Sequence, residues 1–369
     1  MVDSNENGSS MQSIFQLADN LEMPVTETVD IKKNISSIMK EARYQSKRDR
    51  CFYCGKQVSK FCNSHSVPAF TLRNIAHNGK LATLNALINL SMMPTESGVN
   101  NAGTFHFICN NCDSKIFSDY ENPLNYNGQD ITQKMMAQMA LKNYLLVLSK
   151  RSVEEKIYSD LKGRGFSPAD EMLSTINLDY QEFLDGYNKV KRSIEKEWDS
   201  YYLISHMVLD YRVPIAFQDK ITLVTGFDDE IVNNVMCKDE KYQMKDLHIC
   251  VLPLENSTEI IMFIDYDDMS RYRNFYKKFR TMVRKKQLEV INYLIFAYSE
   301  NFFLSPLIPQ KYLNNVELIN VSRLSTVGLV TDFCTQKSPI DMLVEKYTLH
   351  HTELIPNLLC MNINQLSSD

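Results

Sequence analysis

The sequence lacks any apolar run close to the ~20 residues that a helix needs to cross a membrane. Its first residues, MVDSNENGSSMQSIF, have neither the positive start nor the apolar core of a secretory signal peptide. Glycine is scarce, at 11 of 369 residues, whereas Tyr, Phe and Met number 19, 18 and 18, which favours a helix-rich interior with few tight loops. These features predict a cytoplasmic protein with no membrane partner, in which cysteines stay reduced.

The net charge of −5 gives no overall attraction to nucleic acids, so any such binding must come from local basic segments. Residues 32–50 contain seven basic and two acidic residues, and residues 271–286 contain eight basic residues and no acid. Both segments are candidates for phosphate contacts. In the second segment, apolar and aromatic residues repeat at helical spacing, which is more typical of a core-facing stripe than of a base-stacking surface. They are Tyr272, Phe275, Tyr276, Phe279 and Val283.

Cysteines occur in two CxxC pairs, CFYC at 51–54 and CNNC at 109–112. In a reducing compartment two such pairs can present four thiolates tetrahedrally, the arrangement that Zn²⁺ prefers. Cys62 and His65 form a further ligand spacing, CxxH, and with the first pair could complete a four-ligand site by themselves. We expect a structural zinc ion, and whether Cys62 binds it stays open. The predicted ligands are Cys51, Cys54, Cys109 and Cys112.

The order of CFYC, SHSVP at 64–68 and CNNCD at 109–113 resembles that of the HNH endonucleases, the zinc-carrying branch of the His-Me finger (ββα-metal) nucleases. Those proteins have a CxxC, a histidine followed by a hydrophobic residue and proline, and a β-hairpin leading to a second CxxC with Asn or His behind it. The chain is also similar to uncharacterised bacterial HNH-like proteins with an ending such as CDSKIFSDYE at 112–121. The resemblance covers residues 51–121.

The resemblance implies a treble-clef fold with the zinc ion as a structural cofactor. It also implies that His65 is the general base for the attacking water and that Asp113 binds a catalytic Mg²⁺ or Mn²⁺. Histidine exchanges protons near neutral pH, and a carboxylate is a natural ligand for a hard cation, so the chemistry suits phosphodiester hydrolysis. A nucleoside deaminase is excluded because it requires HxE before PCxxC, and Ser66 and Val67 follow His65 here.

The sequence departs from the family pattern in two places. Ser64 stands where many members have a metal-binding Asp, and the middle Asn has no clear counterpart among Asn100, Asn101 and Thr104. His106, in the expected strand TFHFIC, could supply the missing ligand or positioning group. These departures favour an alternative function, a non-catalytic zinc-stabilised module that binds nucleic acid or protein. A toxin-like RNase on the same scaffold is a third candidate.

The chain divides into four regions by composition. Residues 1–50 are a polar segment with a basic helix, 51–125 the HNH-like zinc module, 126–205 a helical region and 206–369 an α+β domain of unknown role. Four β-branched runs in the last region predict a small antiparallel sheet, and a long helix is expected over about 269–300. The runs are MVLDYRVPIAF, KITLVTGF, LHICVLPL and EIIMFIDY, the last two joined by ENST as a hairpin.

The sequence therefore predicts an α+β protein with a ββα-metal, zinc-bound module and a larger helix-rich domain. Its expected function is that of a metal-dependent endonuclease acting on DNA, with RNA as an open alternative substrate and homo-oligomerisation left open. Stand-alone bacterial proteins of this type often belong to phage defence, which is an analogy at the level of the fold.

Overall fold

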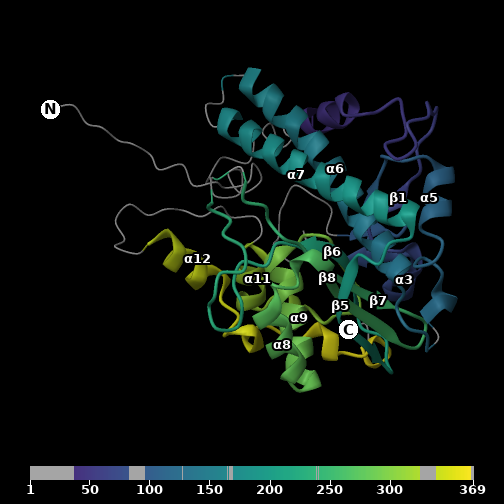
Figure 1. Cartoon of the computed structure of the whole chain (residues 1–369). Coiled ribbons are helices and arrows are strands. Elements are labelled where there is room, and N and C mark those ends of the chain that lie inside the picture. Colours follow the sequence, from purple (N-terminus) through teal and green to yellow (C-terminus); the bar gives the residue numbers. More distant parts are fainter. Residues whose placement is uncertain are drawn as a thin grey trace, which may run out of the picture.

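The computed structural model describes residues 37–82, 96–126, 128–163, 165, 169–237, 239, 241–324 and 338–366 (Figure 1). The N-terminal polar segment up to residue 36 and residues 83–95 of the expected insertion lie outside the described residues. A helix covers residues 37–45, within the basic helix expected before Cys51. Across the described ranges, no helix combines the length and the apolar composition needed to span a bilayer.

A seven-stranded antiparallel sheet forms the centre of the molecule, with the strand order β3-β2-β9-β6-β7-β8-β5. The strands are β2 (Lys80–Ala82), β3 (Glu96–Gly98), β5 (Tyr201–Leu209), β6 (Ile215–Ile221), β7 (Leu247–Pro253), β8 (Thr258–Asp265) and β9 (Phe302–Leu304). Strands β7 and β8 form the hairpin predicted across ENST. The sheet is larger than the small one expected, because β2, β3 and β9 are too short to show a period-2 pattern.

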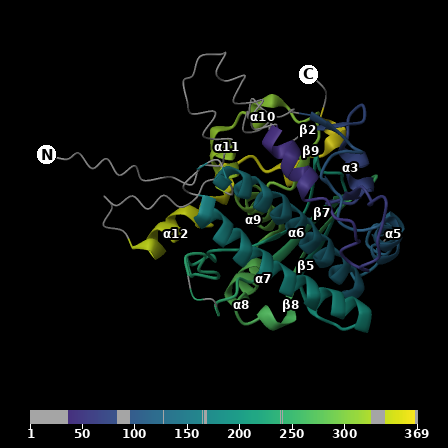
Figure 2. The ribbon, with the colours of Figure 1, turned by 90° about the horizontal axis from the view of Figure 1, so that it is seen from above.

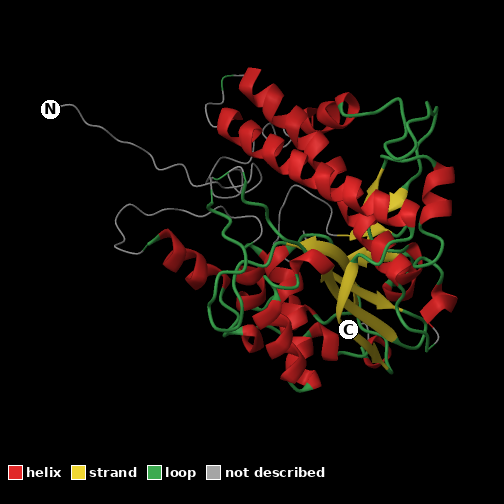
Figure 3. Ribbon diagram, in the orientation of Figure 1, coloured by secondary structure: helices red, strands yellow, loops and turns green. Residues whose placement is uncertain are grey.

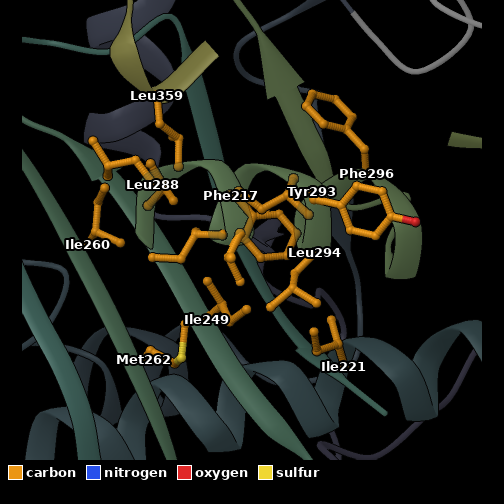
Figure 4. Close-up of a cluster of buried hydrophobic side chains, with 14 of the residues drawn as sticks. Phe217, Ile221, Ile249, Ile260, Met262, Leu288, Tyr293, Leu294, Phe296 and Leu359 are labelled. Carbon is orange, nitrogen blue, oxygen red and sulfur yellow. The ribbon is translucent and has the colours of Figure 1, made fainter. Parts of the chain in front are cut away.

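The two faces of the sheet bury separate layers of side chains. Every residue of β6 and β7 is buried, which explains why LHICVLP reads as a continuous apolar run rather than an alternating one. Ile249 of β7 and Met262 of β8 pack in one layer, whereas Cys250 and Phe263, their neighbours in sequence, pack in the other. Figure 4 shows the first layer, where Ile249 and Met262 lie near Leu294 of a helix.

Helices cover both faces of the sheet (Figure 3). On one face, α6 (Gln133–Gly163) and α7 (Ala169–Lys196) pack side by side as a helical hairpin, visible from above in Figure 2. On the other, α8 (Arg273–Thr281) and α9 (Arg284–Tyr298) supply the core residues. The molecule is thus a mixed α+β structure with helices on each side of a central sheet.

The long helix expected over about 269–300 is wrong in one respect, because the chain breaks it into α8 and α9. Met282 and Val283 adopt extended backbone between the two helices, and the Gln287 side chain donates to the Phe279 carbonyl at the end of α8. The aromatic stripe of α8 is buried as predicted, but Val283 is 74% exposed because it lies in this break. The first two predicted strand runs also miss the observed bounds of β5 and β6.

Short elements surround the first CxxC pair and connect that region to the sheet. They are β1 (Ser64–His65), α3 (Ala69–Ile75), β4 (Thr104–Phe105) and α5 (Asn110–Ile116). Strands β1 and β4 pair antiparallel as a separate two-stranded sheet. Strands β2 and β3, which also come from residues 51–125, belong to the large sheet, where Ala82 pairs with Leu304 of β9. The cysteine-containing segment is therefore continuous with the sheet.

The C-terminal part packs around α9 and the end of the sheet. It contains α10 (Gln310–Leu313), α11 (Val316–Ser322), α12 (Pro339–Tyr347) and three short 3-10 turns. The turns are Thr352–Leu354, Leu358–Cys360 and Ile363–Gln365, and two more lie at Pro123–Tyr126 and Tyr266–Asp268.

Candidate functional site

The four predicted zinc ligands come together. The sulfur atoms of Cys51, Cys54, Cys109 and Cys112 all lie within 4.8 Å of one another, and Cys54 and Cys109 are 4.0 Å apart. Tetrahedral zinc with Zn–S bonds of ~2.3 Å places its sulfurs about 3.8 Å apart, so the four thiols fit a zinc ion in both number and spacing. This cluster can hold a metal ion such as zinc.

The local backbone geometry positions the two cysteines of each CxxC pair. The Cys51 N–H donates to the Lys56 carbonyl over 2.9 Å, and Gly55 turns the chain with a φ of +70°, which glycine adopts without strain. Cys109 directly precedes α5, and Cys112 lies in its first turn. The Cys109 N–H also points to the Cys51 sulfur at 3.3 Å, which joins the two pairs. The sequence forms this site because each pair lies on a tight turn or a helix start.

Cys62 lies outside the four-cysteine cluster, so the alternative site made with His65 does not form. Burial, together with the nearby Asp113 charge, raises the pKa of the Cys62 thiol to about 11. Within the cluster, a backbone hydrogen bond from Lys56 lowers the pKa of Cys54 to about 7, which favours a thiolate there. The two CxxC pairs, without Cys62, are therefore the residues that the geometry brings close enough to bind a metal ion such as zinc.

The first CxxC turn packs on helix α7. The Phe52 ring stacks on Phe107 with centroids 4.4 Å apart and meets Tyr187 of α7 edge-on at 4.9 Å. Lys191, also on α7, donates to the Tyr53 carbonyl over 2.8 Å. Because these contacts come from the residues between Cys51 and Cys54, the cysteine cluster and the helical hairpin support each other.

His65 lies in β1 opposite Thr104 of β4 and is partly exposed. Its Nε2 is 3.0 Å from the Val99 carbonyl oxygen. A carbonyl only accepts hydrogen bonds, so Nε2 carries the proton in the neutral ring and Nδ1 keeps its lone pair. In the described part of the chain no residue hydrogen-bonds to Nδ1. The arrangement leaves one basic nitrogen of His65 available to a water molecule or ligand.

Asp113, in contrast, is already paired. Its Oδ1 accepts hydrogen bonds from the Ser64 hydroxyl at 2.7 Å and from the Lys142 ammonium at 3.0 Å. Burial alone would raise the pKa of Asp113, but the Lys142 charge and the Ser64 hydrogen bond together hold that pKa below its ordinary value. Successive side chains of a strand point to opposite faces, so Asp113 meets the Ser64 face of β1 and not the His65 face.

The residues at Asp113 do not fit a divalent ion as arranged. The Oδ1 of Asp113 already accepts from Lys142 and Ser64, and Lys142 also pairs with Glu121 at 3.0 Å. An ion bound there would lie beside a buried ammonium group of like charge. We therefore assign no chemical step to a catalytic Mg²⁺ or Mn²⁺.

The other predicted site residues take different places. His106 follows β4 rather than lying in it, is exposed, and makes no hydrogen bond to His65 or Asp113 in the described structure. Asn100 and Asn101 contribute backbone carbonyls, which accept from the Asn63 side chain and the Thr104 hydroxyl. The group that orients His65 is thus a backbone carbonyl, which no side-chain motif could reveal.

Sequence reasoning missed two side chains that support the site. Lys142 falls on the apolar stripe of α6, three residues after Met139, and a lysine on such a stripe is a signal for a buried ion pair. No sequence pattern points to Asn301, because it follows helix α9, far from residues 51–125 in the chain. It accepts from the Ser66 hydroxyl at 2.7 Å and donates to the Gln218 carbonyl at 2.6 Å, which fixes the residue after His65 to the large sheet.

The two basic segments differ in how many of their basic side chains are available to contact a ligand. In the described part of the first, the basic residues from Lys40 to Arg50 are all exposed, and the Arg48 guanidinium lies 4.9 Å from the Phe52 ring centroid. In the second, five of the eight basic residues are engaged within the chain; Arg280, for example, donates to the Ile204 carbonyl. The other four are Arg271, Lys278, Arg284 and Lys286. The first segment is thus the better candidate for phosphate contacts.

Comparisons with known proteins identify no relative. No protein-family model matches the chain, and neither a curated protein nor a solved structure matches it.

Proposed function

We propose that the chain is an HNH-type endonuclease that hydrolyses phosphodiester bonds of DNA, with His65 as the general base. The observation that carries the proposal is the Nδ1 of His65, to which none of the described residues hydrogen-bonds, on a strand of the segment that also carries the four-cysteine cluster. The spatial arrangement also supports it, because β1 pairs antiparallel with β4 and α5 comes after β4, which gives two paired strands and a helix as in the family that the motifs resemble; in the chain α3, β2 and β3 come between β1 and β4. In this proposal the cysteine cluster is a treble-clef zinc site.

His65 has the features of a general base. Its Nε2–H is held by the Val99 carbonyl, so Nδ1 can take a proton from a water molecule as that water attacks phosphorus. The imidazolium that forms stays hydrogen-bonded to the same carbonyl, which stabilises its charge. The exposed basic residues before and after Cys51 would contact backbone phosphates independently of sequence.

Plasmid nicking tests the proposal. Supercoiled DNA is incubated with the zinc-loaded chain, with and without added Mg²⁺ or Mn²⁺, beside His65→Ala and the control His77→Ala. We expect His65→Ala to keep its zinc and to nick ~10²–10⁴-fold more slowly, the usual contribution of a general base. His77 is a partly exposed histidine elsewhere in the segment, so His77→Ala should nick at the wild-type rate. Equal nicking by wild type and His65→Ala would contradict the proposal.

The second candidate function is a zinc-stabilised interaction module without catalysis. The observation that favours it is the pairing of Asp113 with Lys142, which removes the expected metal ligand from use. It predicts that the wild type binds DNA or RNA and cuts neither. Offering single-stranded and duplex RNA in the same assay separates the RNase alternative, which requires faster cleavage of RNA than of duplex DNA.

A further inference from the structure

Lys142 lies at the centre of a buried polar cluster beside the proposed site. Its side chain is 1% exposed, and its Nζ lies 3.0 Å from both Asp113 Oδ1 and Glu121 Oε1. The same ammonium lies 3.7 Å from the centroid of the Phe117 ring, whose face attracts a cation. Two carboxylates and an aromatic face thus surround one positive charge.

This cluster joins four segments of the chain. Ser64 belongs to β1, Asp113 to α5, Glu121 to the turn after α5 and Lys142 to α6. The Ser64 hydroxyl donates to the oxygen of Asp113 that also accepts from Lys142. Carboxylate and hydroxyl oxygens converging from separate segments are the ligands that a Mg²⁺ or Mn²⁺ ion takes, but here an ammonium group receives them.

We propose that Lys142 is the resident cation of this cluster and that its ammonium excludes a divalent ion from Asp113. Hydrolysis at His65 then proceeds without a divalent ion bound to Asp113, a consequence that rests on the proposed function. The exclusion has two causes. Asp113 Oδ1 is occupied by two donors, and the Lys142 side chain is 1% exposed, held among Asp113, Glu121 and the Phe117 ring.

Manganese binding tests the exclusion without any assay of activity. Zinc-loaded full-length protein is titrated with Mn²⁺, and free Mn²⁺ is read from its electron paramagnetic resonance signal. We expect no Mn²⁺ binding in the wild type that depends on Asp113, so wild type and Asp113→Asn should give the same curve. We expect Lys142→Met to bind one Mn²⁺ at least tenfold more tightly than the wild type, and Lys142→Met with Asp113→Asn to lose that site.

Lys134→Met is the matched control. Lys134 lies on the same helix and pairs with Asp119 at 3.0 Å, but its side chain is 58% exposed, so its loss should create no Mn²⁺ site. If Lys142→Met does not fold, the comparison of wild type with Asp113→Asn still decides the question. Mn²⁺ binding by the wild type that Asp113→Asn abolishes would overturn the proposal.

Nicking in metal-depleted buffer separates this proposal from the proposed function. Equal nicking with and without Mg²⁺ supports both. Nicking that requires Mg²⁺ supports the endonuclease and overturns the role of Lys142. Absence of nicking under all conditions, together with a Mn²⁺ site that appears only in Lys142→Met, refutes the endonuclease and leaves Lys142 as the cation of a structural cluster.

Discussion

Replacing Cys112 by serine should cost the chain its zinc and much of the stability of the cysteine-containing segment. Cys112 is buried and belongs to the set of four sulfurs within 4.8 Å. Structural zinc sites contribute ~10–16 kcal/mol of binding free energy, so an even share for each of four ligands is about 2.5–4 kcal/mol. This share corresponds to zinc binding weaker by roughly 10²–10³-fold.

The loss of stability in Cys112→Ser should extend beyond the cysteines to the strands and turns around them. Strand β1 is held to β4 by only two residue pairs, and the Cys51–Cys54 turn packs on α7 through Phe52 and Tyr53. At ~2.1 cal/mol/K per residue, unfolding 369 residues gains about 0.8 kcal/mol/K of entropy, so a cost of about 2.5–4 kcal/mol lowers the melting temperature by about 3–5 °C. Hydrogen exchange should rise first in residues 51–82 and 96–117, because these residues carry the four cysteines and the short β1–β4 pair.

The assay compares Cys112→Ser with the control Cys62→Ser, a thiol outside the cluster. Both variants are dialysed against a chelator concentration that leaves one zinc ion per chain in the wild type, and zinc content and melting temperature are then measured. Cys112→Ser should lose its zinc, and Cys62→Ser should keep it. Retention of a full equivalent of zinc by Cys112→Ser, or its loss from Cys62→Ser, would refute the assignment of the ligands.

Two further predictions concern the packing and the pH response of the large sheet. Gly103→Ala should cost about 2–4 kcal/mol, because Gly103 has a φ of +61° and a Cβ there would lie 2.4 Å from the Phe303 ring. Urea unfolding would measure this loss of unfolding free energy. The control is Gly98→Ala, whose added Cβ would meet no atom within 4 Å, so its stability should stay within ~0.5 kcal/mol of the wild type. Burial lowers the pKa of His248 from 6.5 to about 4. Between these pH values the unfolded chain binds a proton that the folded chain does not. The folded state therefore loses about 3 kcal/mol of stability as the pH falls from 6.5 to 4. The measurement is the urea midpoint of unfolding as a function of pH. The midpoint of His248→Gln should fall less between pH 6.5 and 4 than that of the wild type, whereas the exposed control His106→Gln should follow the wild type. Identical pH dependence in all three proteins would refute the role of His248.

The four-cysteine cluster and the central hairpin could be predicted because their signals are local. A CxxC spacing places two thiols on one turn whatever the rest of the chain does, and the runs that became β7 and β8 are apolar because both of their faces are buried. The aromatic stripe of α8 was read correctly from its helical period.

The rest depends on contacts between distant parts of the sequence. Nothing near Ala82 indicates that it pairs with Leu304, and β9 has only three residues. The environment of Asp113 depends on Lys142 from another helix, and that of His65 on a carbonyl. A motif fixes residue types and spacing, whereas the charge beside a carboxylate is set by tertiary packing.

The hydrogen bond between Ser66 and Asn301 joins residues that are 235 positions apart. At synthesis rates of ~5–20 residues per second, Asn301 follows Ser66 from the ribosome by roughly 10–50 s. The cysteine pairs at 51–54 and 109–112 can close around a metal ion early in that interval, whereas the segment after His65 gains its anchor only when Asn301, just before the last strand of the sheet, has been made. A chain that ends before Asn301 would thus have all four cysteines but lack the hydrogen bond that ties Ser66 to the large sheet, so metal content alone would not report a finished protein.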